Sequence, residues 1–510
     1  MILPVNDVEF GKARNQHAKL VTEIAMRVRD FYDRKETFRI YHGSTNSTRI
    51  ISWQRDRIVD TSDLTRILKI DQDKKVALVE PNVSMESLVD ATLAHGLMPP
   101  VVMEFPSITV GGGFAGTAGE SSSFRHGFFD NTINSIEIVL ANGEIVHASQ
   151  DERRDLFRGA AGSFGSLGVI TLLEITLIEA KPYVELTYSI VGGAAESVCK
   201  IEELTKATEA DYIEGILFGV DQGVIISGRL VEDVTDGLRC QRYTRAIDPW
   251  FYTRTEEILK RGQADFQESV PVRDYLFRYD RGAFWAGAFA FKYFMTPLNS
   301  ITRWALDHYM HTSVMYHALH KSGLARQYIV QDIGFPYSKI AEFVKFLDHT
   351  CGFYPLWLCP LRIVGEVALH PQFPMNVEKE GAKEGMMLNV GIWGPGSSKY
   401  DRFVAVNRDI ERKTRELSGV KCLYAQAYYT EDEFWSIYDR EWYDALRAKY
   451  SATSLPSVFE KVRVDLNLGL GGTENTWSSR AYSRFKEIWP IRGVYGVLHA
   501  TKGSEYLLVK

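Results

Sequence analysis

Cysteine is scarce in this sequence and is never paired at close spacing. The cysteines are odd in number and form no C-x-x-C motif. A disulfide framework or a cysteine-rich zinc site needs several cysteines at short, regular spacings. The pattern therefore excludes both and indicates a reducing compartment. The five residues are Cys199, Cys240, Cys351, Cys359 and Cys422.

The sequence also lacks an excess of basic residues. Lysine and arginine number 59 against 65 aspartates and glutamates, which gives a formal net charge of −6. Proteins that bind nucleic acid usually concentrate positive charge in a patch or a run, and none is present here. We therefore predict no nucleic-acid partner.

Long apolar runs are absent as well. Residues 1–7 lack the basic region and apolar stretch of a signal peptide. No uninterrupted apolar segment approaches the roughly 20 residues that cross a bilayer. We expect a cytoplasmic protein that is not secreted and does not span a membrane. Peripheral contact with the endoplasmic reticulum membrane stays open.

What is present indicates at least two folded domains. The 510 residues, 45% of them apolar and 24% charged, exceed the roughly 250–300 residues of one hydrophobic core. Between Phe38 and Ile178, short strands alternate with glycine turns and brief helices. Val76–Glu80 reads as a strand, Ser84 and Gly96 delimit a helix, and Asn142-Gly143 predicts a hairpin. This region is predicted to be α+β.

The second half of the chain shows a different alternation. From about Lys181 to Leu455, helical stretches at 339–348 and 398–417 separate segments with the character of strands. We predict a second α+β domain here. The three extended segments are Tyr354–Leu361, Leu388–Trp393 and Cys422–Tyr429.

Three glycine-rich loops occur in the first half. Gly111-x-Gly113-x-x-Gly116 fits the Rossmann dinucleotide fingerprint, but a hairpin follows where a helix and a second parallel strand are required. We therefore reject a Rossmann fold. Glycines let backbone N–H groups approach a phosphate or a flat ring closely. With the loops at 41–48 and 159–168, they indicate a long phosphate-bearing cofactor; three tight structural turns are the alternative.

These loops carry a family pattern. The segment Val110-Gly-Gly-Gly-x-x-Gly-x-x-Gly119 and the later Gly162-x-x-Gly165-x-x-Gly168 resemble the FAD-binding domain of the vanillyl-alcohol-oxidase/PCMH flavoprotein superfamily. Ser121, His126-Gly127 and Asp155-Leu-Phe157 belong to the same pattern. Within that superfamily the chain resembles the delta-24 sterol reductases from about Phe38 to Val462. That closer likeness lies in Gly119-Glu-Ser-Ser-Ser123, Val330-Gln-Asp332, Tyr354-Pro-Leu-Trp-Leu-Cys-Pro360 and Glu431-x-Glu433-Phe-Trp435.

The resemblance implies a fold and a cofactor. It implies an α+β protein with a PCMH-type, two-subdomain FAD-binding domain over 1–180 and a substrate (cap) domain over 181–455. Residues 456–510 would return to the FAD-binding domain. Non-covalent FAD is implied, because Ser44 or Thr45 and Phe105 stand where relatives attach flavin through histidine or cysteine. The implied FAD-binding residues are Gly43, Ser44, Thr45, Asn46, Ser47, Thr48, Thr109, Val110, Gly111, Gly112, Gly113, Gly116, Thr117, Gly119, Ser121, Ser123, His126, Gly127, Gly162, Gly165, Gly168 and Ile170.

The resemblance also implies an activity. It is NADPH-dependent reduction of a carbon–carbon double bond in a sterol-like lipophilic compound, with hydride passing through FAD. The alternative is an FAD-dependent oxidase or dehydrogenase that oxidises an alcohol and reduces oxygen. Reduction of an alkene also needs a proton donor. The candidate donors are Glu104, Glu120, Tyr424 and Tyr428.

Candidate substrate-binding residues lie on the predicted cap strands. Alternate residues of a strand share a face, and each of these strands carries polar or aromatic residues in that period. The alternatives are that the aromatic residues form sheet core, that Glu104 is a solvated loop residue, and that Cys359 is a buried apolar side chain. The candidates are Trp357, Cys359, Asn389, Trp393 and Gln426, together with Arg362, which shares the face of Trp357 and Cys359 only if Pro360 shifts the register.

Two further features of the cap remain. The helical stretch Thr296–Lys321 carries the pairs His308/His311 and His317/His320, at the i, i+3 spacing that can share a metal. No zinc-protease motif accompanies them, and we expect no metal site. The aromatic segment Phe284–Met295 could line a lipophilic tunnel, lie on a membrane surface or form a buried helix.

Overall fold

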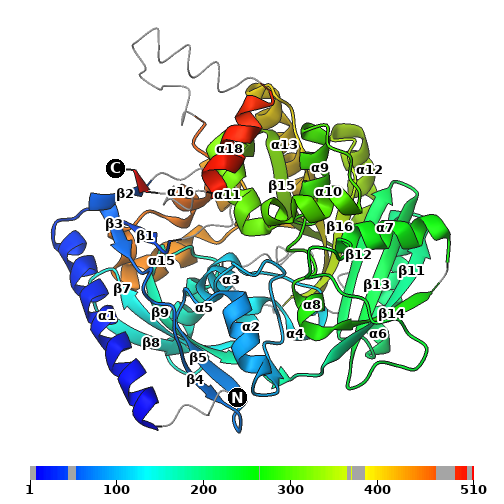
Figure 1. Ribbon diagram of the computed structural model, residues 1–510. Helices are drawn as coiled ribbons and strands as arrows, with labels where there is room; N and C mark the ends of the chain where they lie inside the picture. Colours follow the sequence, from blue (N-terminus) through cyan, green and yellow to red (C-terminus); the bar gives the residue numbers. More distant parts are fainter. Residues whose placement is uncertain are drawn as a thin grey trace.

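The computed structural model describes residues 7–43, 53–263, 265–363, 369, 385–466, 489–501 and 508–509. Two large β-sheets organise these residues, each with helices packed against it, and the later part of the chain lies beside both (Figure 1). The fold is α+β, as the sequence predicts.

The first sheet contains five strands in the order β4-β5-β9-β7-β8. Its strands pair antiparallel throughout the described residues, and the predicted hairpin at Asn142-Gly143 joins β7 to β8. Gly143 has a φ of 82°, which a non-glycine residue would adopt only with strain. The strands are β4 Ile67–Asp71, β5 Val76–Val79, β7 Ile133–Leu140, β8 Ile145–Ser149 and β9 Gly168–Thr176.

Smaller pairings surround this sheet. A parallel pair joins β1 to β3, an antiparallel pair joins β6 to β10, and a parallel pair brings β19, near the end of the chain, beside β2. Their bounds are β1 Arg39–Tyr41, β2 Trp53–Gln54, β3 Ile58–Asp60, β6 Leu97–Met98, β10 Ile178–Glu179 and β19 Leu508–Val509.

Two helices of this part, α2 and α3, begin at residues whose side chains cap them. Ser84 accepts a hydrogen bond from the N–H of Ser87 at the start of α2, and Thr109 accepts one from Gly112 at the start of α3. Such caps satisfy backbone donors that a helix leaves unbonded. The helices are α1 Asp7–Asp33, α2 Met85–Leu93, α3 Val110–Gly116, α4 Ser123–His126 and α5 Arg154–Ala160.

The second sheet contains eight strands in the order β14-β11-β13-β12-β16-β17-β15-β18. The two faces of this sheet pack into different hydrophobic cores. Adjacent residues of a strand point to opposite faces, and Val224 and Ile225 belong to separate clusters. The bounds are β11 Tyr183–Val191, β12 Tyr212–Gly219, β13 Gln222–Val231, β14 Phe266–Pro271, β15 Tyr328–Phe335, β16 Leu356–Arg362, β17 Met386–Pro395 and β18 Val420–Lys421.

Helices cover both faces of this sheet. The side chains of α6, α12 and α13 join the core that contains Ile225, whereas those of α7 and α9 join the core shared with the first sheet. The cap helices are α6 Ala194–Ala207, α7 Phe251–Arg261, α8 Val272–Leu276, α9 Ala286–Tyr293, α10 Ser300–Ala305, α11 Thr312–Ser322, α12 Ile340–Thr350 and α13 Tyr400–Glu416.

The prediction of a strand over Cys422–Tyr429 is wrong. After β18 the chain turns, and only Ala427 forms a bridge, with Arg463. Side chains form hydrogen bonds with the backbone of this segment. The Gln426 carbonyl accepts a hydrogen bond from Gln331 Nε2, and the Tyr428 N–H donates one to Glu411. A neighbouring strand would otherwise have to supply these partners.

The prediction of one helix over Thr296–Lys321 is also wrong. Asn299 caps the short α10, a 3-10 turn follows at Asp307–Met310, and α11 begins at Thr312. The Thr312 N–H donates to Asp280. His311 pairs with Asp280 and Asp307, and no group of side chains able to hold a metal occurs within the described residues.

Three short helices after the second sheet return to the first domain. Tyr443 donates to Ser166, Lys449 pairs with Asp155, and Lys461 donates to the Phe164 carbonyl. We therefore propose that the return begins near 431, ahead of the expected bound at 456. These helices are α14 Glu431–Trp435, α15 Arg440–Lys449 and α16 Val458–Val462.

The last described helix, α18 (Ile491–Thr501), packs instead against the cap helix α11. In the stretches of chain that the structure describes, no helix combines the length and apolar character needed to cross a bilayer.

His17 attaches α1 to the first sheet through two carboxylates. Its ring nitrogens lie 2.9 Å from Glu80 and 3.0 Å from Glu137. Burial alone would lower the pKa of His17, but hydrogen bonds with Glu137 and Glu80 outweigh it and raise the pKa to about 9. The histidine is therefore charged in the folded state at neutral pH.

This raised pKa predicts a pH-dependent stability. The contribution is fully present below the unfolded value of 6.5 and is lost as pH rises through about 9. A shift from 6.5 to about 9 corresponds to on the order of 3 kcal/mol. We expect the stability difference between wild type and His17→Gln, measured by denaturant unfolding, to shrink over that range. A constant difference would contradict the pairing.

Candidate active site

A cavity of about 360 Å³ lies between the first domain and the cap sheet. The glycine loop that contains α3 forms one wall, through Thr109, Gly112 and Gly116. Residues of β16 and β17 form part of the opposite wall. Trp357 and Cys359 share one face of β16, as predicted, and Cys359 pairs with Asn389 on β17. Trp357, Asn389 and Trp393 border the cavity.

The five glycines of the loop have two different roles. A Cβ at Gly111 would lie 2.7 Å from Pro81, one at Gly119 would lie 2.8 Å from Leu361, and one at Gly113 would overlap Met103. These three glycines permit close packing. A Cβ at Gly116 would meet only Tyr424, at 3.9 Å, and one at Gly112 would meet its own capping residue. Gly112 and Gly116 therefore keep the cavity clear.

Of the other residues expected to bind FAD, some border the cavity and some do not. Gly165, Gly168 and Ile170 border the cavity with the loop, as does Thr117, which is left-handed at φ 49°. The remaining described ones do not border the cavity: Gly43, Val110, Ser121, Ser123, His126, Gly127 and Gly162. Ser44, Thr45, Asn46, Ser47 and Thr48 lie outside the described residues.

The cavity suits a phosphate-bearing flavin. Arg39 and Lys461 border it and supply positive charge, and Lys461 holds the loop carbonyls of Phe164 and Gly165 at 3.0 Å. Gly112 and Gly116 leave room for a flat or phosphorylated group beside backbone. Phe105, at the position where some relatives carry a cysteine, is buried among aromatic rings.

Arg278 is a fully buried cation at the junction of the two domains. Its guanidinium contacts Glu214 of β12 at 2.8 Å and Glu104 of the first domain at 3.1 Å. It also donates to Ser121 Oγ at 3.3 Å. Tyr279 and Trp357 donate to the second oxygen of Glu214. The buried charges are thus paired across the junction, as burial requires.

Glu120 lies beside this cluster on the cavity wall. Burial and the neighbouring carboxyl of Glu104 raise the pKa of Glu120 well above its usual range. The Oε2 atom of Glu120 is buried and has no hydrogen-bond partner among the residues that the structure describes. A raised pKa favours the protonated form of a carboxyl, and a protonated carboxyl at a cavity wall can donate a proton.

A second acidic group faces the same cavity. Asp332 of β15 accepts hydrogen bonds from Tyr424 Oη and, at 2.7 Å, from Asn389 Nδ2. Burial raises the pKa of Asp332, although these hydrogen bonds act in the opposite direction. Burial and the Asp332 charge hold the pKa of Tyr424 well above its usual range. Tyr424 therefore remains protonated and is already engaged as a donor.

Four other candidates lie away from the cavity wall. Tyr428 donates to Gln426 at 2.8 Å within the core on the far face of the sheet. Gln426 donates to the Ala325 carbonyl. Cys359 is fully buried, with its thiol pKa raised by burial and then by Glu120, and Arg362 is exposed at the end of β16.

Arg278 and Asp332 were not among the site residues predicted from the sequence. Asp332 belongs to the quoted segment Val330-Gln-Asp332, and its place on a cap strand two residues from Val330 could have suggested a shared face. Arg278 carried no such signal, because its partners lie 64 and 174 residues away in the chain.

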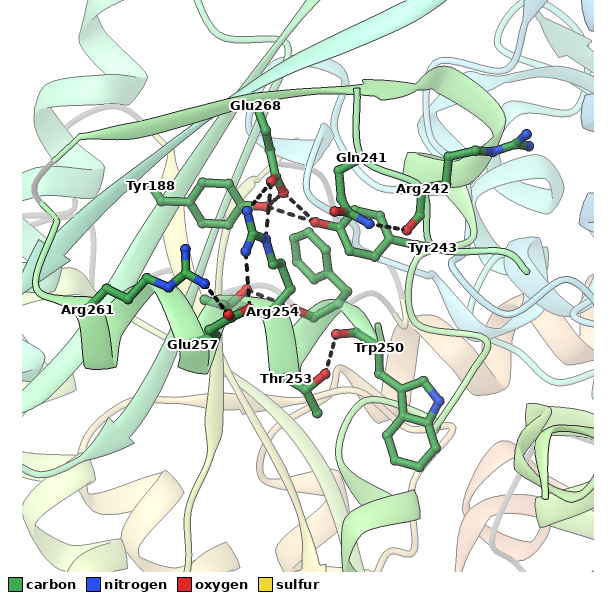
Figure 2. Close-up of polar contacts among 12 residues, drawn as sticks. Tyr188, Gln241, Arg242, Tyr243, Trp250, Thr253, Arg254, Glu257, Arg261 and Glu268 are labelled. Atoms are coloured by element: carbon green, nitrogen blue, oxygen red, sulfur yellow. Dashed lines mark hydrogen bonds and ion pairs between the residues drawn. The ribbon is translucent and has the colours of Figure 1, made fainter. Parts of the chain in front are cut away.

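A second buried ion pair, Arg254 with Glu268, provides a comparison within the cap. Figure 2 shows Arg254 of α7 directed at Glu268 of β14, where Tyr188 and Tyr243 also converge. The guanidinium lies 2.9 Å from the Glu268 carboxylate. This cluster belongs to the cap alone, whereas the Arg278 cluster joins the cap to the first domain.

The two clusters give a matched prediction. Arg278→Leu and Arg254→Leu each leave a buried carboxylate without its ion-pair partner. Each should therefore reduce the free energy of unfolding by about 3 to 5 kcal/mol. Only Arg278→Leu should also change the absorbance spectrum of bound flavin, because Glu104 and Glu120 border the cavity. Chemical denaturation and the spectrum of the folded protein check this. Equal spectral changes in both variants would show that the cap transmits any disturbance to the cavity.

The chain is similar to a known domain family and to several characterised proteins. Residues 17–149 match the FAD binding domain family. The Delta(24)-sterol reductase of Arabidopsis thaliana is 30% identical over 428 residues, which cover 77% of this chain and 74% of the relative. The Homo sapiens Delta(24)-sterol reductase is 27% identical over 89% of this chain and 88% of its own length. Cytokinin dehydrogenase 4 of Oryza sativa subsp. japonica is 32% identical over 28% of the chain and 27% of its own length.

Fold, site and family match define an FAD-dependent oxidoreductase. The coverage by the plant relative extends the likeness through the cap as well as the FAD-binding domain. The chain belongs to the delta(24)-sterol reductase family.

Proposed function

We propose that this protein reduces a carbon–carbon double bond of a sterol-like lipophilic substrate, with NADPH as the source of electrons. The observation that carries the proposal is Glu120, a buried carboxyl at the cavity wall whose pKa is raised and whose Oε2 has no hydrogen-bond partner among the described residues. Removal of hydride from an alcohol would instead call for a group that accepts a proton.

The wall near Glu120 suits an apolar substrate. Phe105, Phe284 and Trp393 pack together, with ring centroids 5.2 to 5.7 Å apart, and border the cavity with Tyr316. Aromatic side chains bury large apolar areas and fix the orientation of a flat ligand. Asn389 Oδ1 is buried and, within the described part of the chain, has no partner, so it can accept a hydrogen bond from a substrate hydroxyl.

FAD bound here and reduced by NADPH would supply hydride to one alkene carbon. Glu120 would supply the proton that the other carbon needs, because burial and then the neighbouring Glu104 carboxyl raise its pKa and favour its protonated form. Arg278 fixes Glu104 through its ion pair. Tyr424 and Asp332 form a second hydrogen-bonded pair at the wall.

We also propose that the protein is intracellular and binds FAD without a covalent bond. All five cysteines are free thiols, which suits a reducing compartment. Acid precipitation should leave the flavin in the supernatant, because no covalent bond would hold the flavin to the precipitated protein.

Anaerobic stopped-flow mixing tests the direction of the reaction. With NADPH we expect rapid bleaching of the flavin band, followed by recovery of the band when a Δ24-sterol is added. The saturated product should then be detected by mass spectrometry. Bleaching by an alcohol but not by NADPH, with rapid reoxidation by air, would support the oxidase alternative instead.

A further inference from the structure

Exposed apolar side chains gather on one part of the cap. Large hydrophobic residues with high exposure occur in the segment 295–304 and again in 489–498. We call these residues the α10–α18 patch, which consists of Met295, Leu298, Ile301, Trp304, Trp489, Val494 and Leu498. Contiguous exposed apolar surface of this kind marks an interaction site.

The two segments of the patch are in contact. The indole of Trp489 donates to the Tyr293 carbonyl at 2.8 Å, and a Cβ at Gly493 would touch Phe294 and Tyr293. In Figure 1, α18 lies with α9, α10 and α11 in the upper part of the molecule. Segments almost 200 residues apart in the chain therefore build one surface.

The charge around the patch is one-sided. Residues 286–306 and 489–501 contain no aspartate or glutamate, although 65 residues of the chain are acidic. They contain Lys292, Arg303 and Arg492. The protein as a whole has a net charge of −6, so this surface departs from the average in sign.

We infer that the α10–α18 patch docks on the surface of a membrane that contains anionic lipid. Exposed tryptophan and aliphatic side chains beside basic residues have the composition of interfacial membrane-binding segments. A second copy of the chain fits less well, because self-association would bring the same positive charges together.

Docking would also bring the cavity close to lipid, a consequence that rests on the proposed function. Tyr316 on one side of α11 borders the cavity, while Ala318 and Ser322 on the same helix contact Gly496 of α18. A helix with its side chains is about 10 Å across. Along this line α18 and α11 both lie between the docked surface and the cavity, so a lipophilic substrate would pass two helix layers, about 20 Å, to reach it.

Vesicle co-sedimentation of the full-length FAD-bound protein tests the docking. We expect binding to vesicles of phosphatidylcholine with phosphatidylserine, weaker binding to phosphatidylcholine alone, and loss of the difference at high salt. Ile301 and Trp304 lie three residues apart on one face of α10. Replacement of both by serine should reduce the partition coefficient about tenfold or more.

Ile247→Ser provides the matched control. Ile247 is 72% exposed and Ile301 is 73% exposed, but Ile247 lies outside the patch. This control should bind vesicles like the wild type. Absent binding of the wild type, or equal loss in both variants, would overturn the docking. A dimer in sedimentation velocity that Ile301→Ser with Trp304→Ser dissociates would assign the patch to a second copy.

The outcomes separate this inference from the proposed reaction. Sedimentation needs no turnover, so a protein that binds vesicles through the patch but reduces no sterol would contradict the reaction alone. A protein that reduces detergent-dispersed Δ24-sterol without binding vesicles would contradict the docking alone.

Discussion

Gly112→Asp should give a folded protein that does not retain FAD. Gly112 borders the cavity, and its Cβ would meet only the cap of its own helix, so a side chain there projects into the cofactor space. An aspartate in the first turn of α3 is itself favourable to the helix. Its charge would repel the pyrophosphate and its volume would occupy the space that the glycine leaves. The flavin absorbance of the purified protein measures the loss.

The control for this prediction is Gly112→Ala. A methyl group at this position needs only a small shift of the Thr109 hydroxyl, which lies 3.1 Å from the added Cβ. This variant should retain most of its flavin, and circular dichroism should show that both variants are folded. Stoichiometric FAD in Gly112→Asp would mean that the pyrophosphate lies elsewhere in the cavity.

Glu120→Gln should abolish turnover while FAD binding and reduction of the flavin by NADPH persist. Glutamine keeps the shape of the side chain but has no acidic proton to donate. Loss of a positioned proton donor costs typically 10²- to 10⁴-fold in rate. Single-turnover measurements should therefore show normal bleaching and a slow return of the flavin band with sterol.

The pH profile gives a second readout of the same group. Because the pKa of Glu120 is raised, sterol reduction should extend to higher pH than an ordinary glutamate would allow, and it should fall as pH rises through that pKa. Tyr424→Phe tests the competing donor. A greater loss in Tyr424→Phe than in Glu120→Gln would transfer the donor role to Tyr424 and its partner Asp332.

The sequence predicted those features that depend on residues close together in the chain. Ser84 marked the start of α2 correctly, Gly96 lies three residues beyond its last residue Leu93, and Asn142-Gly143 marked the hairpin between β7 and β8. These signals are local, because a cap or a two-residue turn is determined by its own side chains. The alternation along β16 and β17 likewise placed Trp357 and Asn389 on the inner face of the cap sheet.

The missed features depend on partners that are distant in the chain. The segment Cys422–Tyr429 has the composition of a strand, yet side chains from β15 and α13 bind its backbone. Arg278 resembles any surface arginine until Glu104 and Glu214 enclose it. Glu120 was a candidate from its motif, but only the fold reveals that burial and the nearby Glu104 raise its pKa.

The return of α14–α16 to the first domain has a consequence for biosynthesis. Tyr443 and Lys461, which hold Ser166 and the loop at Phe164, are synthesised only after the entire cap. A nascent chain that has emerged from the ribosome only as far as residue 180 therefore lacks part of the cavity wall. We expect the ribosome-bound N-terminal fragment to remain without flavin, and FAD to be captured only when the chain has passed Lys461.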